Sequence, residues 1–216
     1  MRGFLHEKVF GVLSDERGFY ALLWVLIAAP LLLTALVSAS GVYTSVYTAD
    51  VDAQEALAFA VKAAAMQVLP AAQAAGDRHI YPSGAHAAFR AALAANMGLD
   101  PSSLQPLNGS PYASAPKYWL VVYNGSDKYS AQGALGARMY TFDGEAVTES
   151  AFPYSGFPAY FAVSDSGVAS GSGGTRTVKL ETQGAVALIE ATAKRVLGQG
   201  TITLKRWAAA RVVDAN

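Results

Sequence analysis

The 216-residue chain contains no cysteine, and only 15% of its residues are charged. The lack of cysteine excludes disulfides, thiolate nucleophiles and cysteine metal ligands, and it is compatible with either side of a membrane. Basic and acidic residues both number 16, so the formal net charge is zero. Without a basic field to attract phosphates, we expect no nucleic-acid partner.

Histidine is also scarce, with three in the chain: His6, His79 and His86. Pro82 lies between the last two and breaks any common helical face, so we expect exposed loop residues there and not a metal site. The sequence offers no nucleophile, base and orienting residue that could be assigned together to one catalytic site. We therefore expect no enzyme and no cofactor, and an envelope hydrolase is the least favoured function.

Two glycine-containing segments have too few ligands for a site. Ser164-Asp165-Ser166-Gly167 resembles part of a calcium loop but lacks the further acids that a full site needs. The glycines between 171 and 174 lack the flanking strand and helix of a phosphate-binding loop. Residues 164–175 are therefore expected to form a flexible loop without a metal.

Charged side chains are missing from one long stretch, the 32 residues from Gly18 to Ala49. Its most apolar part is Phe19 to Val37. A helix needs about 20 mostly apolar residues to cross a hydrocarbon layer of about 30 Å. The sequence therefore predicts a membrane-spanning helix over residues 19–42, bent near Pro30 because proline removes a backbone donor.

The flanking charges predict an orientation for this single-pass membrane protein. Three bases precede the uncharged run and acidic residues follow it, and bases close to a span stay in the cytoplasm. We expect residues 1–18 to be a cytoplasmic leader or tail and residues 70–216 to be extracytoplasmic. The alternative is a secretory signal peptide cleaved near Ser38-Ala39-Ser40, although the apolar run exceeds the roughly 7 to 15 residues of such peptides.

Beyond the uncharged run, residues 43–69 have the pattern of an amphipathic helix. Apolar side chains recur at helical spacing, and Pro70 stops the pattern. No cap separates this helix from the preceding one, so one long helix from about Phe19 to Leu69 is predicted. Its apolar stripe consists of Leu57, Val61, Ala64 and Val68.

The remaining sequence predicts an α+β domain with an antiparallel sheet packed against this stripe. Residues 84–97 have helical periodicity, and residues 185–191 fit either a helix or a buried strand. Runs of aromatic and β-branched residues, closed by turn pairs such as Asn124-Gly125, predict the strands. The expected strands are residues 117–123, 138–142, 159–163, 177–181 and 201–213.

Residues Asp15 to Leu33, DERGFYALLWVLIAAPLLL, resemble the processing region of type IV prepilin-like proteins, with Gly18-Phe19 as the cleavage point. Ala29 to Leu33 and Asp52 to Ala58 look more closely like TadE and TadG type pilus-assembly proteins. The resemblance implies a pilin-like fold and a non-enzymatic pseudopilin or minor pilin that assembles or anchors a pilus. Its implied partners are the membrane, other pilin-like subunits and a prepilin peptidase, and its implied location is the cell surface.

One residue departs from the family pattern. Leu23 is the fifth residue after the cleavage point, where major pilins and TadE proteins usually carry glutamate. Such a carboxylate is thought to meet the N-terminal amine of a neighbour, and leucine cannot do so. The departure favours a minor, initiating or anchoring component over a repeating filament subunit.

Two sets of residues are candidates for partner contacts. Small residues allow close approach of helices, and the N-terminal helix offers Ala28, Ala29, Pro30, Ala35, Ser38 and Ser40. The segment 152–158 is aromatic, and Phe152, Tyr154 and Phe157 are candidates for an exposed partner surface. The second function considered is therefore a tethered cell-surface binding module that uses this aromatic loop.

Overall fold

The computed structural model of the protein describes residues 16–166, 173–194 and 200–212. The chain divides into two units, residues 1–44 with 196–198, and residues 45–195 with 199–216. The boundary lies within helix α2 (Glu16–Ala65), so each unit contains a part of the same helix.

The described part of the first unit is α2 from Glu16 to Thr44. Pro30 lies inside the helix, and the Thr34 hydroxyl donates a 2.7 Å hydrogen bond to the Pro30 carbonyl. Such a bond from a threonine to the carbonyl four residues earlier is accommodated within a helix and often accompanies a bend.

The expectation of a membrane-spanning helix over residues 19–42 is wrong. In the described part of the chain, no helix combines the length and the apolar character that a membrane crossing needs. A crossing takes about 20 predominantly apolar residues.

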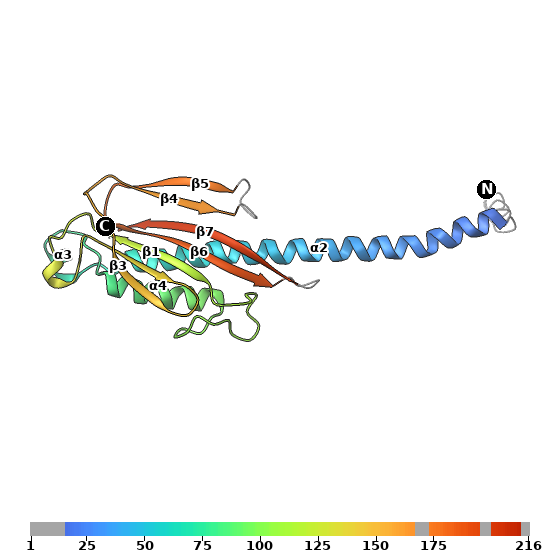
Figure 1. Ribbon diagram of the computed structural model, residues 1–216, viewed down its shortest axis with the longest axis horizontal. Coiled ribbons are helices and arrows are strands. Elements are labelled where there is room, and N and C mark those ends of the chain that lie inside the picture. The colour runs from blue at the N-terminus through green and yellow to red at the C-terminus, as the bar shows by residue number, and fades with distance from the viewer. Residues whose placement is uncertain (1–15, 167–172, 195–199, 213–216) are drawn as a thin grey trace, which may run out of the picture. The chain divides into compact units, whose positions relative to one another are not determined.

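The second unit contains helices and strands that form a mixed domain (Figure 1). Its elements are α2 from Ser45 onward, α3 (Pro70–Ala74), α4 (Pro82–Met97), β1 (Lys117–Tyr123), η1 (Ser130–Gln132), β2 (Ala137–Phe142), β3 (Val147–Ala151), β4 (Ala159–Asp165), β5 (Gly174–Leu180), β6 (Gly184–Lys194) and β7 (Thr201–Arg211).

The strands form two antiparallel sheets. Five strands pair in the order β3-β2-β1-β6-β7, and β4 pairs with β5 in a separate hairpin. Helix α4 and the second-unit part of α2 pack on one face of the larger sheet, and the hairpin packs on the other (Figure 1). The predicted α+β class with an antiparallel sheet is confirmed.

Alternation along β6 explains how one sheet serves two hydrophobic clusters. Ala185, Ala187 and Ile189 belong to the cluster on the helical side, whereas Val186 belongs to the cluster beneath the hairpin. Successive side chains of a strand point to opposite faces, so both faces of this strand are apolar. This two-sided burial resolves the choice between helix and strand for residues 185–191 in favour of a strand.

Local sequence sets the ends of α4. Pro82 stands at its start, where the missing N–H needs no partner. Gly98 ends it with a φ of 64°, and its N–H donates to the Ala94 carbonyl. The structure also contains α3 and β3, which the sequence analysis did not predict, and α2 ends at Ala65 and not near Leu69.

Candidate functional site

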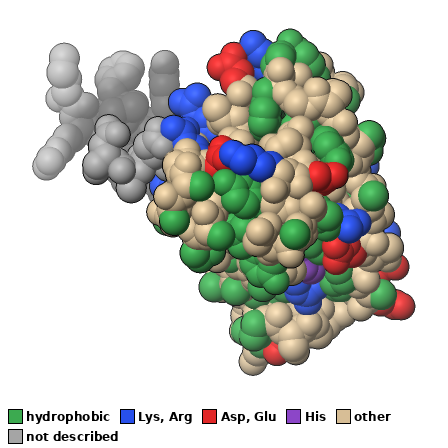
Figure 2. Space-filling model, turned by 90° about the vertical axis from the view of Figure 1, so that its left-hand side faces the viewer, with side chains coloured by type: hydrophobic (Ala, Val, Ile, Leu, Met, Phe, Trp, Pro, Cys, Tyr) green, Lys and Arg blue, Asp and Glu red, His purple; other side chains and the backbone are tan. Residues whose placement is uncertain are grey.

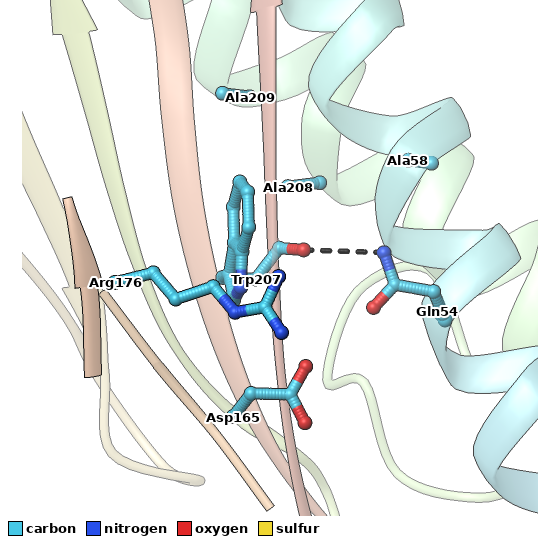
Figure 3. Close-up of a pocket in the computed structure, with 7 residues that line it drawn as sticks. All are labelled: Gln54, Ala58, Asp165, Arg176, Trp207, Ala208 and Ala209. Atoms are coloured by element: carbon cyan, nitrogen blue, oxygen red, sulfur yellow. Dashed lines mark hydrogen bonds between the residues drawn. The ribbon is translucent and has the colours of Figure 1, made fainter. Parts of the chain in front are cut away.

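A cavity of about 400 Å³ lies beside the outer edge of β7 (Figure 3). Gln54 and Ala58 of α2 form one wall, and charged residues at the hairpin form another. The Gln54 amide donates a 3.2 Å hydrogen bond to the Trp207 carbonyl. The residues that line this cavity are Gln54, Ala58, Asp165, Arg176, Trp207, Ala208 and Ala209.

Next to this cavity, a buried arginine joins three elements. The Arg206 guanidinium of β7 donates to Asp50 of α2 and to Asp165, the last residue of β4. Arg206 is 1% exposed and Asp50 is fully buried. Removing a guanidinium from water is costly unless carboxylates pair with it, so this group acts as a clamp between helix, sheet and hairpin.

The sequence analysis read part of the clamp as a fragment of a calcium loop. In the structure, Asp165 is bonded to Arg206, and Ser166 exchanges hydrogen bonds with the Lys205 backbone. A guanidinium therefore occupies the place that a cation would need. Gly167 lies outside the described residues. Among the residues that the structure describes, no group of three or more acids and histidines is arranged to hold a metal.

The two histidines of the second unit are not exposed loop residues as expected. His79 is buried, and its Nε2 lies 3.0 Å from the Ser126 hydroxyl. Burial lowers the pKa of His79. Its Nδ1 has no hydrogen-bond partner among the described residues, and the Asp77 carboxylate accepts hydrogen bonds from Lys128 and Tyr129. A serine and histidine pair without an orienting acid lacks one part of a nucleophilic triad.

His86 lies within an aromatic cluster of α4 and the sheet. Its Nε2 is 2.7 Å from the Tyr118 hydroxyl, and its ring stacks on Tyr140 at 4.2 Å. Burial, with the nearby Arg90 charge, lowers the pKa of His86 to about 4. The imidazole is therefore neutral at pH 7 and belongs to the core packing.

The predicted aromatic partner surface is largely fastened to its own domain. Tyr154 donates to Asp127, and Phe157 packs edge-on against Tyr123 at 5.5 Å. The Tyr123 hydroxyl donates a 2.8 Å hydrogen bond to the Gly156 carbonyl of the same loop. Tyr154 and Phe157 keep partly exposed rings, but much of the loop's aromatic surface is used internally.

Phe152 lies in a different place from the other two candidates. It stacks on Phe161 at 5.9 Å and lines a cavity of about 330 Å³ between β4 and the larger sheet. Trp119 and Tyr160 line the same cavity and are exposed. The cleft becomes visible only when the two sheets pack together, because its walls are far apart in sequence.

The predicted helix-packing residues all lie on α2. Ala29, Pro30 and Ala35 are exposed, and Ala28 and Ser38 are half-buried. Gly18 and Phe19 fall within α2, but the side chains of Phe19 and Ser40 lie outside the described residues. The same part of α2 exposes large apolar side chains: Leu23, Trp24, Val25, Leu26, Ile27, Leu31, Leu32, Leu33 and Leu36.

The face shown in Figure 2 carries lysine, arginine, aspartate and glutamate interspersed with hydrophobic side chains. No single sign of charge dominates that face. No protein-family model, curated protein or solved structure matches this chain.

Proposed function

We propose that this chain is a non-enzymatic, pilin-like assembly subunit that packs the N-terminal part of α2 against equivalent helices of other subunits. One observation carries the proposal: this part of α2 exposes a dense set of large apolar side chains. Leu26 is 69% exposed, and Leu31 and Leu36 are 66% and 67% exposed. Burying such a side chain is worth about 1.5 to 3 kcal/mol, so association with like helices is strongly favoured.

The composition of this helix supports close packing in such an assembly. Ala28, Ala29 and Ala35 are interspersed with the leucines, and small residues allow neighbouring backbones to approach. Thr34 bonds to the Pro30 carbonyl, so a backbone acceptor near the proline is satisfied within the helix. A helical neighbour therefore meets a surface that is apolar and has few unsatisfied polar groups.

The resemblance of Asp15 to Leu33 to prepilin processing regions supports the pilin-like part of the proposal. In this proposal, a prepilin peptidase cuts after Gly18, and the second unit acts outside the cytoplasm. Leu23, in place of the family's usual glutamate, favours an accessory or initiating role over that of the main filament subunit.

The apolar cleft beneath the hairpin favours a second candidate function, a surface binding module. Trp119 is 37% exposed and Tyr160 is 64% exposed beside a cavity of about 330 Å³. Aromatic rings at a concave surface are common at binding sites for apolar or aromatic groups. This candidate replaces the aromatic-loop surface that the sequence predicted.

Mass spectrometry of the mature chain, recovered from cells that also make the other pilus components, tests the first proposal. We expect a chain that begins at Phe19, and replacement of Gly18 by a bulky residue should leave the chain uncut. A mature chain that begins at Met1, together with unchanged appendages in the Gly18 variant, would contradict it.

A matched pair of variants tests the packing surface. Leu26→Gln with Leu32→Gln should abolish co-purification of the chain with other subunits, because polar groups replace apolar contacts. Leu107→Gln, at a leucine that is 51% exposed in the second unit, is the control and should leave co-purification intact. Equal loss in both variants would count against a role for α2.

A further inference from the structure

The second-unit part of α2 exposes a stripe that the sheet does not cover. Asp52, Glu55, Phe59 and Lys62 are spaced at i, i+3, i+7 and i+10, which is one face of a helix. Met66 continues the stripe in the turn after α2, and all five residues are exposed. Phe59 is 58% exposed and Met66 is 69% exposed. The stripe is distinct from the apolar surface at residues 23–36.

A shallow groove runs along this stripe between α2 and α4. It has a volume of about 390 Å³ and is lined by Phe59, Lys62 and Ala63 of α2, by Met66 in the turn after α2, and by Ala92 and Asn96 of α4. The Asn96 amide donates a 2.7 Å hydrogen bond to the Ala92 carbonyl, so it is used within its own helix. The groove therefore offers mainly apolar contact.

The two charges beside Phe59 have opposite signs and lie one heptad apart. At 1.5 Å per residue, Glu55 and Lys62 are separated by about 10.5 Å along the axis, too far to pair within one helix. Neither side chain forms an ion pair with another described residue. The acidic end of the stripe thus precedes Phe59, and the basic end follows it.

We propose that this stripe binds a second copy of the same chain in an antiparallel arrangement, with the two-fold axis between Ala58 and Phe59. In that arrangement Glu55 of each copy faces Lys62 of the other, so both pairs form. The two Phe59 rings pack beside the axis, and Met66 reaches the start of the partner's stripe. A two-fold contact uses the same surface on both copies and closes on itself.

Charge complementarity selects this arrangement over a parallel one. A parallel copy in register places Glu55 against Glu55, and a shift of one heptad brings together a single pair. The stripe of each chain can contact only one neighbour at a time. A third copy therefore cannot add a second shifted contact on the same face. This inference goes beyond the proposed function and does not depend on processing at Gly18.

The absence of cysteine makes disulfide crosslinking a direct test. We mix full-length chains that carry Glu55→Cys with chains that carry Lys62→Cys and oxidise them. The expected product is a dimer of about 45 kDa, twice the 22.5 kDa of one chain. The mixture should yield at least roughly fivefold more crosslinked dimer than either variant by itself, because the second Glu55 and Lys62 pair stays intact.

Thr148→Cys, on an exposed position of β3, is the matched control and should give little dimer. A dominant crosslink of Glu55→Cys chains with themselves would show a parallel contact and overturn the proposal. Crosslinks to other proteins with none between copies would overturn it as well.

Charge exchange provides an independent readout. Glu55→Lys or Lys62→Glu should each weaken self-association roughly tenfold by analytical ultracentrifugation, because each change places like charges together twice. The double variant should restore it. Both residues are exposed, so the fold and its circular dichroism should stay unchanged. Weakening without restoration in the double variant would overturn the antiparallel pairing.

Discussion

The two parts of helix α2 place leucine side chains in opposite environments. Leu26, in the first unit, is 69% exposed, whereas Leu57, in the second unit, is fully buried against the sheet. Four alanines flank Leu57 on the buried face, and they let the helix approach the strands closely: Ala53, Ala56, Ala60 and Ala64.

The first part of α2 thus exposes many large apolar side chains, whereas most of the side chains that the second part buries are alanines. Burial of large apolar groups is the main favourable term in folding and association. A helix that buries alanine internally and exposes leucine leaves its strongest contacts for another molecule. This contrast is what supports assembly through the N-terminal part.

The largest expected effect concerns the clamp that holds the buried part of α2. Arg206→Ala leaves Asp50 and Asp165 near each other without their counter-charge, and breaking a buried ion pair costs about 3 to 5 kcal/mol. Urea denaturation of the full chain measures this loss.

Arg176→Ala, at an exposed residue of the neighbouring cavity, is the control and should change the free energy of unfolding by less than about 0.5 kcal/mol. If Arg206→Ala lowered the free energy of unfolding as little as the Arg176→Ala control, the clamp would contribute little.

A pair of leucine variants tests the contrast within α2 directly. Leu57→Ala should lower the free energy of unfolding by about 2 to 5 kcal/mol, because it leaves a cavity in the core. Leu32→Ala, at a leucine that is 64% exposed, should change it by less than about 0.5 kcal/mol but weaken association with other subunits. Similar stability losses in both would erase the distinction between the two parts.

The aromatic cluster on the helical face predicts a pH dependence. The pKa of His86 falls from 6.5 to about 4 on folding, so the unfolded chain binds more protons between these values. Stability from the neutral ring is present above pH 6.5 and is lost as the pH falls towards 4. Allowing for partial exposure, the loss is about 1 to 2 kcal/mol.

Denaturation of the native chain and of His86→Gln at pH 7 and pH 4 separates the contribution of His86 to the pH dependence from that of the acidic residues. The variant should lose less stability than the native chain over this interval. An identical pH dependence in both proteins would contradict the assignment.

The smallest expected effect on the second unit is that of Pro30→Ala. The change restores a backbone donor in the exposed part of α2, where proline costs about 3 kcal/mol relative to alanine. Amide hydrogen exchange near Leu26 should slow, while the urea transition of the second unit should not move. A shift of that transition would show that the two parts of α2 unfold together.

Much of the second unit was predictable from local patterns. The aromatic and β-branched run 117–123 is strand β1, and the stripe at Leu57 and Val61 is buried as its periodicity indicated. The short strand β3 escaped notice because VTESA has little apolar alternation. Its pairing with β2 follows from the hairpin that Asp143 stabilises by accepting from two backbone N–H groups.

The candidate sites were less predictable, because their parts come from distant segments. Asp50 and Arg206 are 156 residues apart in sequence, and Asp165 alone had drawn attention, for a different chemistry. Burial of His79 likewise depends on its contact with the turn at Ser126. No local signal indicates such pairs.

The sequence by itself determined the α+β class, the apolar surface of α2 and the strand-forming runs, because periodicity and β-branching act on neighbouring residues. Only the tertiary structure decided which charges are buried and where the aromatic cleft lies. Those properties depend on which surfaces meet, and burial of a charge or a ring is settled only when distant segments pack together.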